Sequence, residues 1–181
     1  MLSEIQNWLK QLESRARLLN MLTKENNKGL TWLRTNQHKS IKEKLKKGSE
    51  QFSSQGRLLS HASGENSFEK WPYDFTLQES DQENQLIGIR LIAEIDLSGS
   101  SENCLLHDFY KILQADADVK LLVIQKEFKE GFITATNEYE KTMKAYKHKL
   151  KSEILLACWI TSEDRFAFKR YSIDISYAPQ W

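Results

Sequence analysis

The sequence contains few of the residues that interrupt or cross-link a chain. Its 181 residues include only 7 glycines, 2 prolines and 2 cysteines. The scarcity of glycine and proline favours long, regular helices and strands. Cys104 and Cys158 lack the spacing of a metal site, so we expect two buried, reduced thiols rather than ligands or a disulfide framework.

Long apolar runs are also lacking. The longest uninterrupted run, from Ile154 to Ile160, has seven residues, whereas a membrane-spanning helix needs about 20. The first residues have neither the basic patch nor the apolar segment of a signal peptide. Hydrophobic residues make up 40% of the chain and charged residues 28%, which is enough to fill a core. We therefore expect a soluble, cytoplasmic protein.

The net charge of +1 hides an uneven distribution. Residues 1–60 hold 12 Lys and Arg against 5 Asp and Glu, a net charge of +7. Residues 61–118 hold 3 against 12, a net charge of −9, and residues 119–181 hold 11 against 8, a net charge of +3. An acidic centre between basic flanks suits a metal site served by phosphate-binding arms. It suits equally a chain whose segments neutralise one another.

Apolar residues at heptad-like spacing predict a first helix, and they are Leu2, Ile5, Leu9, Leu12, Ala16 and Leu19. The stripe is too short for an independent coiled coil, so it packs onto the domain or onto a second subunit. Packing onto a second subunit would form a homodimer through the N-terminal helices. A further helical stretch begins after Gly29, carries Leu30, Leu33, Ile41 and Leu45, and ends in a lysine-rich segment. Residues 49–64 are predicted to form a loop apart from Leu58 and Leu59.

The rest of the chain alternates between strand and helix patterns. A strand begins at Trp71, a polar turn covers 80–84, and strand, helix and strand follow near 85–97, 102–115 and 119–125. A helix near 136–150 and strands near 153–160 and 165–175 complete the order. We expect an α/β fold with a mixed central sheet flanked by helices. Residues 1–60 form an N-terminal helical, basic segment and residues 61–181 the core, joined in one integrated domain.

Two carboxylates lie near the end of the strand at 85–97. Strand side chains alternate between faces, so Glu94 and Asp96 share one face. The apolar residues of this strand line the other face, and they are Ile89, Leu91, Ala93, Ile95 and Leu97. Two acids at the carboxyl end of a buried strand can offer hard oxygen ligands to a divalent ion.

A hairpin whose second strand bears acids, followed by a helix and a central strand, resembles the core of the PD-(D/E)xK, or restriction-endonuclease-like, nucleases. The resemblance covers roughly residues 68–160. It rests on the segments Trp71-Pro-Tyr-Asp74, Ala93-Glu94-Ile-Asp96, Asp108-Phe-Tyr-Lys111 and Ala117-Asp118-Val-Lys120. It implies a restriction-endonuclease-like core and phosphodiester hydrolysis of DNA with Mg²⁺, or Mn²⁺ in its place, as in a restriction or defence endonuclease.

Residue by residue, the resemblance makes Glu94 the central metal ligand. Asp96 takes the position where the family usually has lysine, and Lys111 on the next helix could supply the missing ammonium. Asp74 would be the upstream acid and third metal ligand, with Glu69 as its rival. A turn centred on Gln82 places residue 74 opposite residue 90, so Asp74 reaches Glu94 only through a bulge or a longer turn.

Simpler interpretations of the same residues stay open. The acids could be solvent-facing residues of an edge hairpin. Asp108 and Lys111 lie three residues apart on a helix, so they could form a plain ion pair.

Basic residues near the N-terminus are candidates for contacts with a nucleic-acid backbone, and they are Arg34, Lys39, Lys42, Lys46, Lys47 and Arg57. A lysine-rich run is also typical of a solvated helix face. DNA is the expected partner, and RNA remains open. Two alternatives to the nuclease are a catalytically decayed fold that binds nucleic acid or protein, and an assembly protein that acts through its N-terminal helices.

Overall fold

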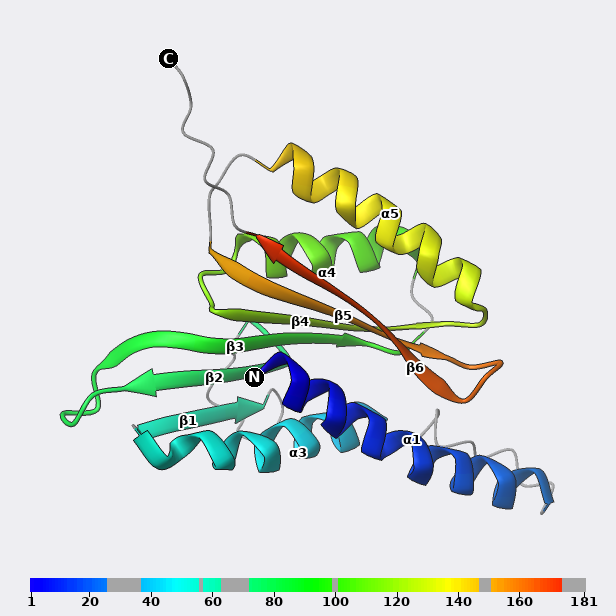
Figure 1. Cartoon of the computed structure of the whole chain (residues 1–181), viewed down its shortest axis with the longest axis horizontal. Helices are drawn as coiled ribbons and strands as arrows, with labels where there is room; N and C mark the ends of the chain where they lie inside the picture. The colour runs from blue at the N-terminus through cyan, green and yellow to red at the C-terminus, as the bar shows by residue number, and fades with distance from the viewer. Residues whose placement is uncertain (26–36, 56, 63–71, 99–100, 147–150, 174–181) are drawn as a thin grey trace.

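Figure 1 shows the computed structural model, which describes residues 1–25, 37–55, 57–62, 72–98, 101–146 and 151–173. The helices are α1 (Leu2–Glu25), α3 (Gln37–Ser49), α4 (Glu102–Gln114) and α5 (Lys129–Ala145), with a 3-10 helix at Glu50–Gln55. The strands are β1 (Arg57–Ala62), β2 (Phe75–Ser80), β3 (Leu86–Asp96), β4 (Val119–Lys126), β5 (Ser152–Ile160) and β6 (Arg165–Ile173).

All six strands form one mixed sheet in the order β1-β2-β3-β4-β5-β6. The first three strands form an antiparallel meander, β3, β4 and β5 are parallel, and β6 returns antiparallel to β5. Parallel neighbours need a crossover connection, and α4 and α5 provide the two crossovers. The predicted α/β architecture, a mixed sheet flanked by helices with an N-terminal helix, is confirmed at this level.

Helices cover both faces of the sheet (Figure 1). On one face α1 and α3 pack on odd-numbered β3 residues such as Leu91, Ala93 and Ile95. On the other face α4 and α5 pack on a second cluster that includes Ile92. The central strand β4 contributes to both clusters and is buried from Val119 to Ile124, as a parallel strand between two helical layers should be.

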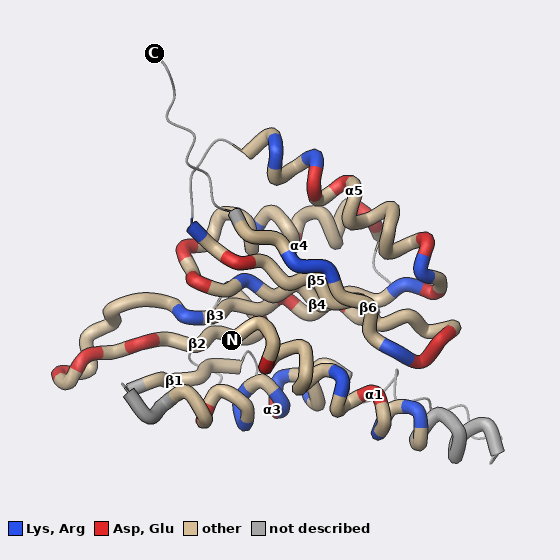
Figure 2. Tube along the Cα trace, viewed as in Figure 1, with Lys and Arg blue, Asp and Glu red and all other residues tan. Residues whose placement is uncertain are grey.

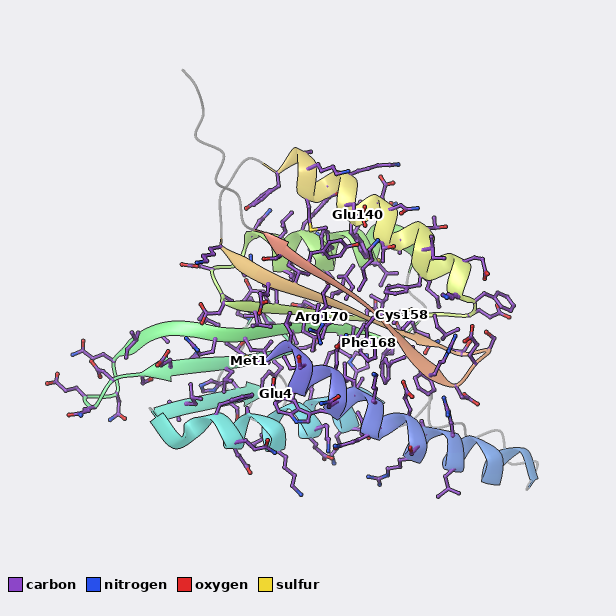
Figure 3. The ribbon with its side chains drawn as sticks, in the orientation of Figure 1. Met1, Glu4, Glu140, Cys158, Phe168 and Arg170 are labelled. Atoms are coloured by element: carbon purple, nitrogen blue, oxygen red, sulfur yellow. The ribbon has the colours of Figure 1, made fainter. Side chains whose placement is uncertain are left out.

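The heptad-like stripe of α1 is buried within the single chain. Leu2, Ile5, Leu9, Leu12 and Ala16 belong to the same core cluster as the sheet residues, while the side chain of Leu19 lies outside the described part. Polar contacts fix α1 against β6, because the backbone N–H of Phe166 donates to Glu13 Oε1 at 2.8 Å. Figure 3 shows β6 at the first turn of α1, where Arg170 contacts Ser3 Oγ at 3.4 Å. The stripe therefore packs onto the domain, and the homodimer stays a prediction.

Two predicted segments differ from the structure. The loop expected over 49–64 contains the 3-10 helix and β1, because Leu58 packs against the core and the backbone pairs with β2. The boundary drawn at residue 60 thus falls inside β1. The helix expected near 136 already begins at Lys129, since Phe132 and Ala135 extend its buried stripe to its first turns. Its predicted end near Leu150 lies outside the described residues.

Two single-residue predictions are also wrong. Ile89 packs against the α4–α5 cluster rather than with Leu91, because the β2–β3 pairing shifts between them. Cys104 is exposed at the start of α4, while Cys158 is buried, and both are free thiols. In the part of the chain that the structure describes, no helix combines the length and apolarity needed to cross a membrane.

Candidate functional site

The β2–β3 pairing brings Asp74 beside Glu94. Register shifts occur between Leu77 and Gln78 and between Glu79 and Ser80, so Phe75 lies opposite Ala93. The pairing of residue 74 with residue 90, expected for a regular turn centred on Gln82, is therefore wrong, whereas the shifted pairing that Asp74 needs to reach Glu94 is present. The backbone N–H of Ile95 donates to Asp74 Oδ2 at 2.9 Å and fixes this carboxylate at the carboxyl end of β3. Its rival Glu69 lies outside the described residues.

Glu94 is a buried carboxylate paired with a lysine. It is 5% exposed, and Lys111 Nζ donates to its Oε1 at 2.6 Å. Burial raises the pKa of Glu94 to about 7 despite the opposing effect of Lys111, and the charges of Asp74 and Asp108 raise it further. The pKa identifies a carboxylate whose charge is poorly solvated, a condition often found at functional sites.

Lys111 reaches Glu94 from α4, whose first turn is capped by Ser101. The backbone N–H of Cys104 donates to Ser101 Oγ at 3.4 Å. The Lys111 ammonium also lies 5.9 Å from the centre of the Tyr73 ring. Lys111 therefore pairs with Glu94, although its spacing in the sequence also allowed an ion pair with Asp108.

Tyr73 borders this cluster and was not identified from the sequence. Burial raises its pKa, the charge of Glu94 raises it further, and Lys111 lowers it. Its position next to Asp74 was the only signal that could have found it. An isolated aromatic residue before a strand has no spacing that distinguishes a site residue from a packing residue.

The upstream acid Asp74 has an ammonium partner of its own. Lys42 Nζ lies 2.9 Å from Asp74 Oδ1, and the two side chains are 16% and 23% exposed. Lys42 belongs to α3, which packs on the opposite face of the sheet from α4. Lysines from two helical layers thus contact the two neighbouring carboxylates.

Two further acids lie within electrostatic range of the pair. Asp96 Oδ1 accepts hydrogen bonds from the backbone N–H of Ser98 at 3.0 Å and from its hydroxyl at 2.7 Å. Burial raises the pKa of Asp108, Lys111 opposes this, and the charges of Asp96 and Asp74 raise it further. Asp96 shares a strand face with Glu94, as the alternation predicted.

The donor set has the chemistry of a divalent-cation site, but ammonium groups occupy it. Carboxylate oxygens are the ligands that Mg²⁺ prefers. Among the described residues, no group of three or more His, Cys, Asp or Glu side chains is arranged to hold a metal ion. Lys111 and Lys42 instead contact Glu94 and Asp74.

One buried polar atom near these acids is left unsatisfied. The hydroxyl of Tyr139, on α5, has no hydrogen-bond partner among the described residues, although its side chain is only 2% exposed. Burial raises the pKa of Tyr139, and the charges of Glu102, Asp108 and Asp96 raise it further.

The predicted nucleic-acid contacts have different environments. Lys39 and Lys47 are exposed on α3, Lys46 is half-buried, and Lys42 contacts Asp74. Arg34 and the side chain of Arg57 lie outside the described residues. Figure 2 shows the concentration of basic residues along α3, which carries five lysines and one glutamate.

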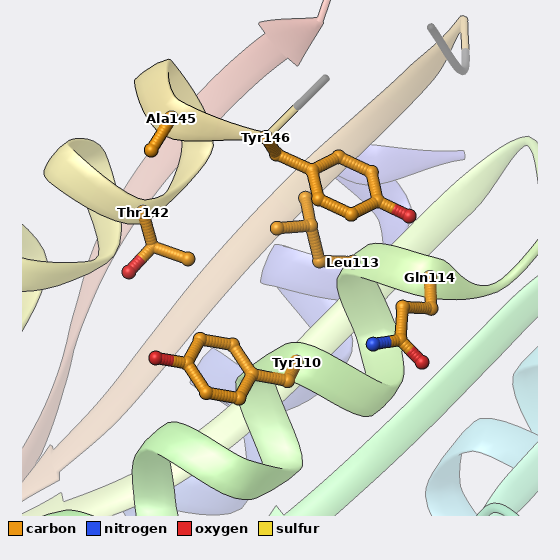
Figure 4. A pocket seen from close by; sticks show the side chains of 6 residues that line it. All are labelled: Tyr110, Leu113, Gln114, Thr142, Ala145 and Tyr146. Atoms are coloured by element: carbon orange, nitrogen blue, oxygen red, sulfur yellow. The ribbon is translucent and has the colours of Figure 1, made fainter. Parts of the chain in front are cut away.

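A separate pocket of about 360 Å³ lies between the C-terminal turns of α4 and α5 (Figure 4). Its walls are formed by Tyr110, Leu113, Gln114, Thr142, Ala145 and Tyr146. Among the residues that the structure describes, neither the clustered carboxylates nor any other charged side chain lines it. The pocket therefore adds nothing to the chemistry of the cluster.

Comparison with protein-family models, with curated proteins and with solved structures finds no match for this chain. The acid–lysine cluster must therefore be interpreted from its own geometry.

Proposed function

We propose that this protein hydrolyses phosphodiester bonds in DNA with Mg²⁺, or Mn²⁺ in its place. One observation carries the proposal. Asp74, Glu94 and Lys111 come from three separate segments, yet Lys111 contacts Glu94 at 2.6 Å and Asp74 is hydrogen-bonded to the backbone of β3 beside it. Acids and an ammonium group in one small region are the groups that this chemistry requires.

Each residue has a distinct role in this proposal. Glu94, Asp74 and Asp96 are the carboxylates that would hold the cation, which supplies charge neutralisation at the phosphate and a lower pKa for its water. Lys111, already beside Glu94, donates a hydrogen bond that orients the attacking water. Asp108 adds negative charge near Glu94.

The order of elements supports the finer fold proposal. An acid-bearing hairpin (β2–β3) is followed by α4 and by β4, which is parallel to β3. This is the arrangement on which the likeness to restriction-endonuclease-like nucleases rests. The likeness also motivates the proposals of a restriction or defence role and of a homodimer that cuts both strands. The basic face of α3 supports contact with the DNA backbone.

The first experiment incubates the purified full chain with supercoiled plasmid in Mg²⁺ and then in Mn²⁺. We expect nicking that Glu94→Ala abolishes, while duplex binding changes little because Glu94 is buried away from the basic face. Glu138→Ala is the matched control, since Glu138 is an exposed acid paired with Lys141 on α5. Nicking by Glu94→Ala at the wild-type rate would refute the proposal.

A second function, binding without catalysis, is favoured by the two ion pairs. Both Glu94 and Asp74 already have ammonium partners, and Asp96 stands where the nuclease pattern has lysine. A decayed site would bind nucleic acid or protein through the same surface. Calorimetric titration with Mg²⁺ and Mn²⁺ separates the two functions, because a decayed site gives no heat that depends on Glu94.

A further inference from the structure

The β2–β3 hairpin projects beyond the helical layers and exposes two adjacent apolar side chains at its end (Figure 1). Leu86 is 55% exposed and Ile87 is 63% exposed. Ile87 has no partner residue on β2, because the second register shift takes the pairing from Gly88 directly to Leu86. A Cβ added to Gly88 would meet no atom within 4 Å. This end of the hairpin therefore has apolar surface that a second molecule can cover.

Acidic residues accompany these apolar side chains on a turn of fixed shape. Glu79, Asp81 and Glu83 lie within five residues of one another. Asp81 Oδ1 accepts hydrogen bonds from the backbone N–H groups of Glu83 at 2.9 Å and Gln85 at 2.8 Å, which hold the turn together. A turn held in this way loses little conformational entropy when a partner binds to it.

The complementary charge lies at the same end of the molecule. Helix α3 carries five lysines and one glutamate, and Lys47 is exposed in its last turn. The helix continues through the 3-10 helix into β1, whose first residue, Arg57, pairs with Ser80 beside the hairpin turn. Figure 2 shows acidic residues at the hairpin tip and basic residues along α3. A two-fold interface requires a surface that complements itself, and this end of the molecule carries both halves of one.

We propose that this end of the protein binds a second copy of the chain: the hairpin of each protomer packs against the last turn of α3 in the other, so that Leu86 and Ile87 are covered and Glu83 meets Lys47. A second copy is the occupant because the chain itself carries the basic helix that the acidic hairpin complements. The first turn of α3, with Lys39, stays outside the contact. The inference gives an interface to the homodimer of the proposed function and rests on that function only for the use of the dimer.

The test measures self-association of the full chain by sedimentation equilibrium across the micromolar range, without nucleic acid. We expect the wild type to dimerise, and high salt to weaken the dimer because it screens the charge pairs. Glu83→Lys and Lys47→Glu should each weaken dimerisation about tenfold, because each reversal brings like charges together at both copies of the contact.

An equimolar mixture of these two variants should associate as tightly as the wild type. In the mixed dimer the hairpin lysine of one chain meets the helix glutamate of the other, and the second contact is the native one. A contact between hairpin and helix within one chain would not be restored by mixing. The mixture therefore tests the proposed reciprocal arrangement directly.

An apolar substitution with a matched control tests the other half of the contact. Ile87→Ser should weaken dimerisation about tenfold, since it removes apolar area from the interface. Leu18→Ser changes an apolar residue of α1 that is 57% exposed and should leave the dimer unchanged. Thermal unfolding verifies that each variant is folded, and Ile87→Ser decides the matter if a charge reversal prevents folding.

The outcomes separate this interface from the proposed hydrolysis. A wild type that stays monomeric throughout, or a dimer that neither Glu83→Lys nor Ile87→Ser weakens, overturns the inference whatever the plasmid assay gives. A mixture of the two charge variants that fails to associate overturns the reciprocal packing. Dimerisation that follows all these changes, together with uncut plasmid, supports the interface and refutes hydrolysis.

Discussion

At the scale of single residues, the molecule carries ionisable groups that its core solvates poorly. Glu94 is 5% exposed and Lys120 is fully buried, with its ammonium donating to the carbonyl of Leu113 at 3.1 Å. Burial disfavours the charged form of both groups, which raises the pKa of the acid and lowers that of the lysine. Only Glu94 lies in the candidate site, so the two make a useful pair for testing stability.

Replacement of Glu94 by Gln should stabilise the protein at neutral and higher pH. The pKa of Glu94 is about 7 in the folded protein, whereas an unperturbed glutamate has a pKa of 4.5. A raised pKa contributes stability below 4.5, and that contribution is lost as the pH rises to 7. We expect Glu94→Gln to gain roughly 1–3 kcal/mol of unfolding free energy over the wild type at pH 8, and little at pH 4.5.

Urea unfolding at both pH values measures this difference. Lys111 is 31% exposed, so it can turn to solvent when its partner is neutral. The matched control is Glu138→Gln on the surface of α5, which should show no such pH dependence. A Glu94→Gln protein less stable than the wild type at pH 8 would mean that the pair with Lys111 outweighs the burial of the carboxylate.

Lys120 should give the opposite pH profile. Burial lowers its pKa from 10.5 to about 8. The unfolded chain then binds more protons between these values, so this residue makes stability rise with pH across that window. Lys120→Met should remove the rise, which amounts to roughly 1–3 kcal/mol. Chemical unfolding at several pH values between 8 and 10.5 tests it, with the exposed Lys141→Met as control, and an unchanged slope would contradict it.

At the scale of elements, one close contact fixes α1 against α3. A Cβ added to Gly48 would lie 2.5 Å from Trp8 Cε2, well inside contact distance to a rigid indole ring. Either the Trp8 ring must shift or the two helices must move apart to accommodate it. We expect Gly48→Ala to cost about 1–3 kcal/mol, the usual penalty for overpacking.

Thermal and urea unfolding measure the effect of Gly48→Ala. Gly88 provides the control within the same chain, because a Cβ built there meets no atom within 4 Å. Gly88→Ala should therefore leave stability unchanged or raise it slightly. Equal stability of the two variants would show that Trp8 moves aside without cost.

At the scale of the whole molecule, α1 covers one face of the sheet. Leu2, Ile5, Leu9 and Leu12 belong to one core cluster with strand residues such as Trp159. Deletion of residues 1–25 would expose that face to water. We expect the truncated chain to lose cooperative thermal unfolding and to bind a hydrophobic dye, because the lost apolar burial exceeds the small stability of a typical domain.

Gel filtration and thermal unfolding of the truncated chain decide between two roles of α1. A folded, cooperative, monomeric product would mean that α1 serves self-association rather than the core. An aggregated or non-cooperative product supports the packing seen here. Deletion of α4 would be no useful control, because α4 carries Lys111. The control is Glu4→Ala, which changes an exposed residue of α1 and should leave the fold intact.

The sequence determined much of the fold by local periodicity. The period of α1, the alternation of β3 and the apolar run of β4 each report a single element and its buried face. Local periodicity did not predict strand β1 or the first turns of α5. Strand β1 is stabilised by pairing with β2. The first turns of α5 are stabilised by the burial of Phe132 and Ala135.

The sequence by itself determined that Glu94 and Asp96 share a face, because alternate side chains of a strand lie on the same face of the sheet. Only the tertiary structure decided which groups meet them. The two register shifts of the β2–β3 hairpin carry Asp74 to Glu94, and the packing of α3 and α4 on opposite faces brings Lys42 and Lys111 to these acids. Cross-strand register and helix docking depend on the whole core, so no local pattern in the sequence records them.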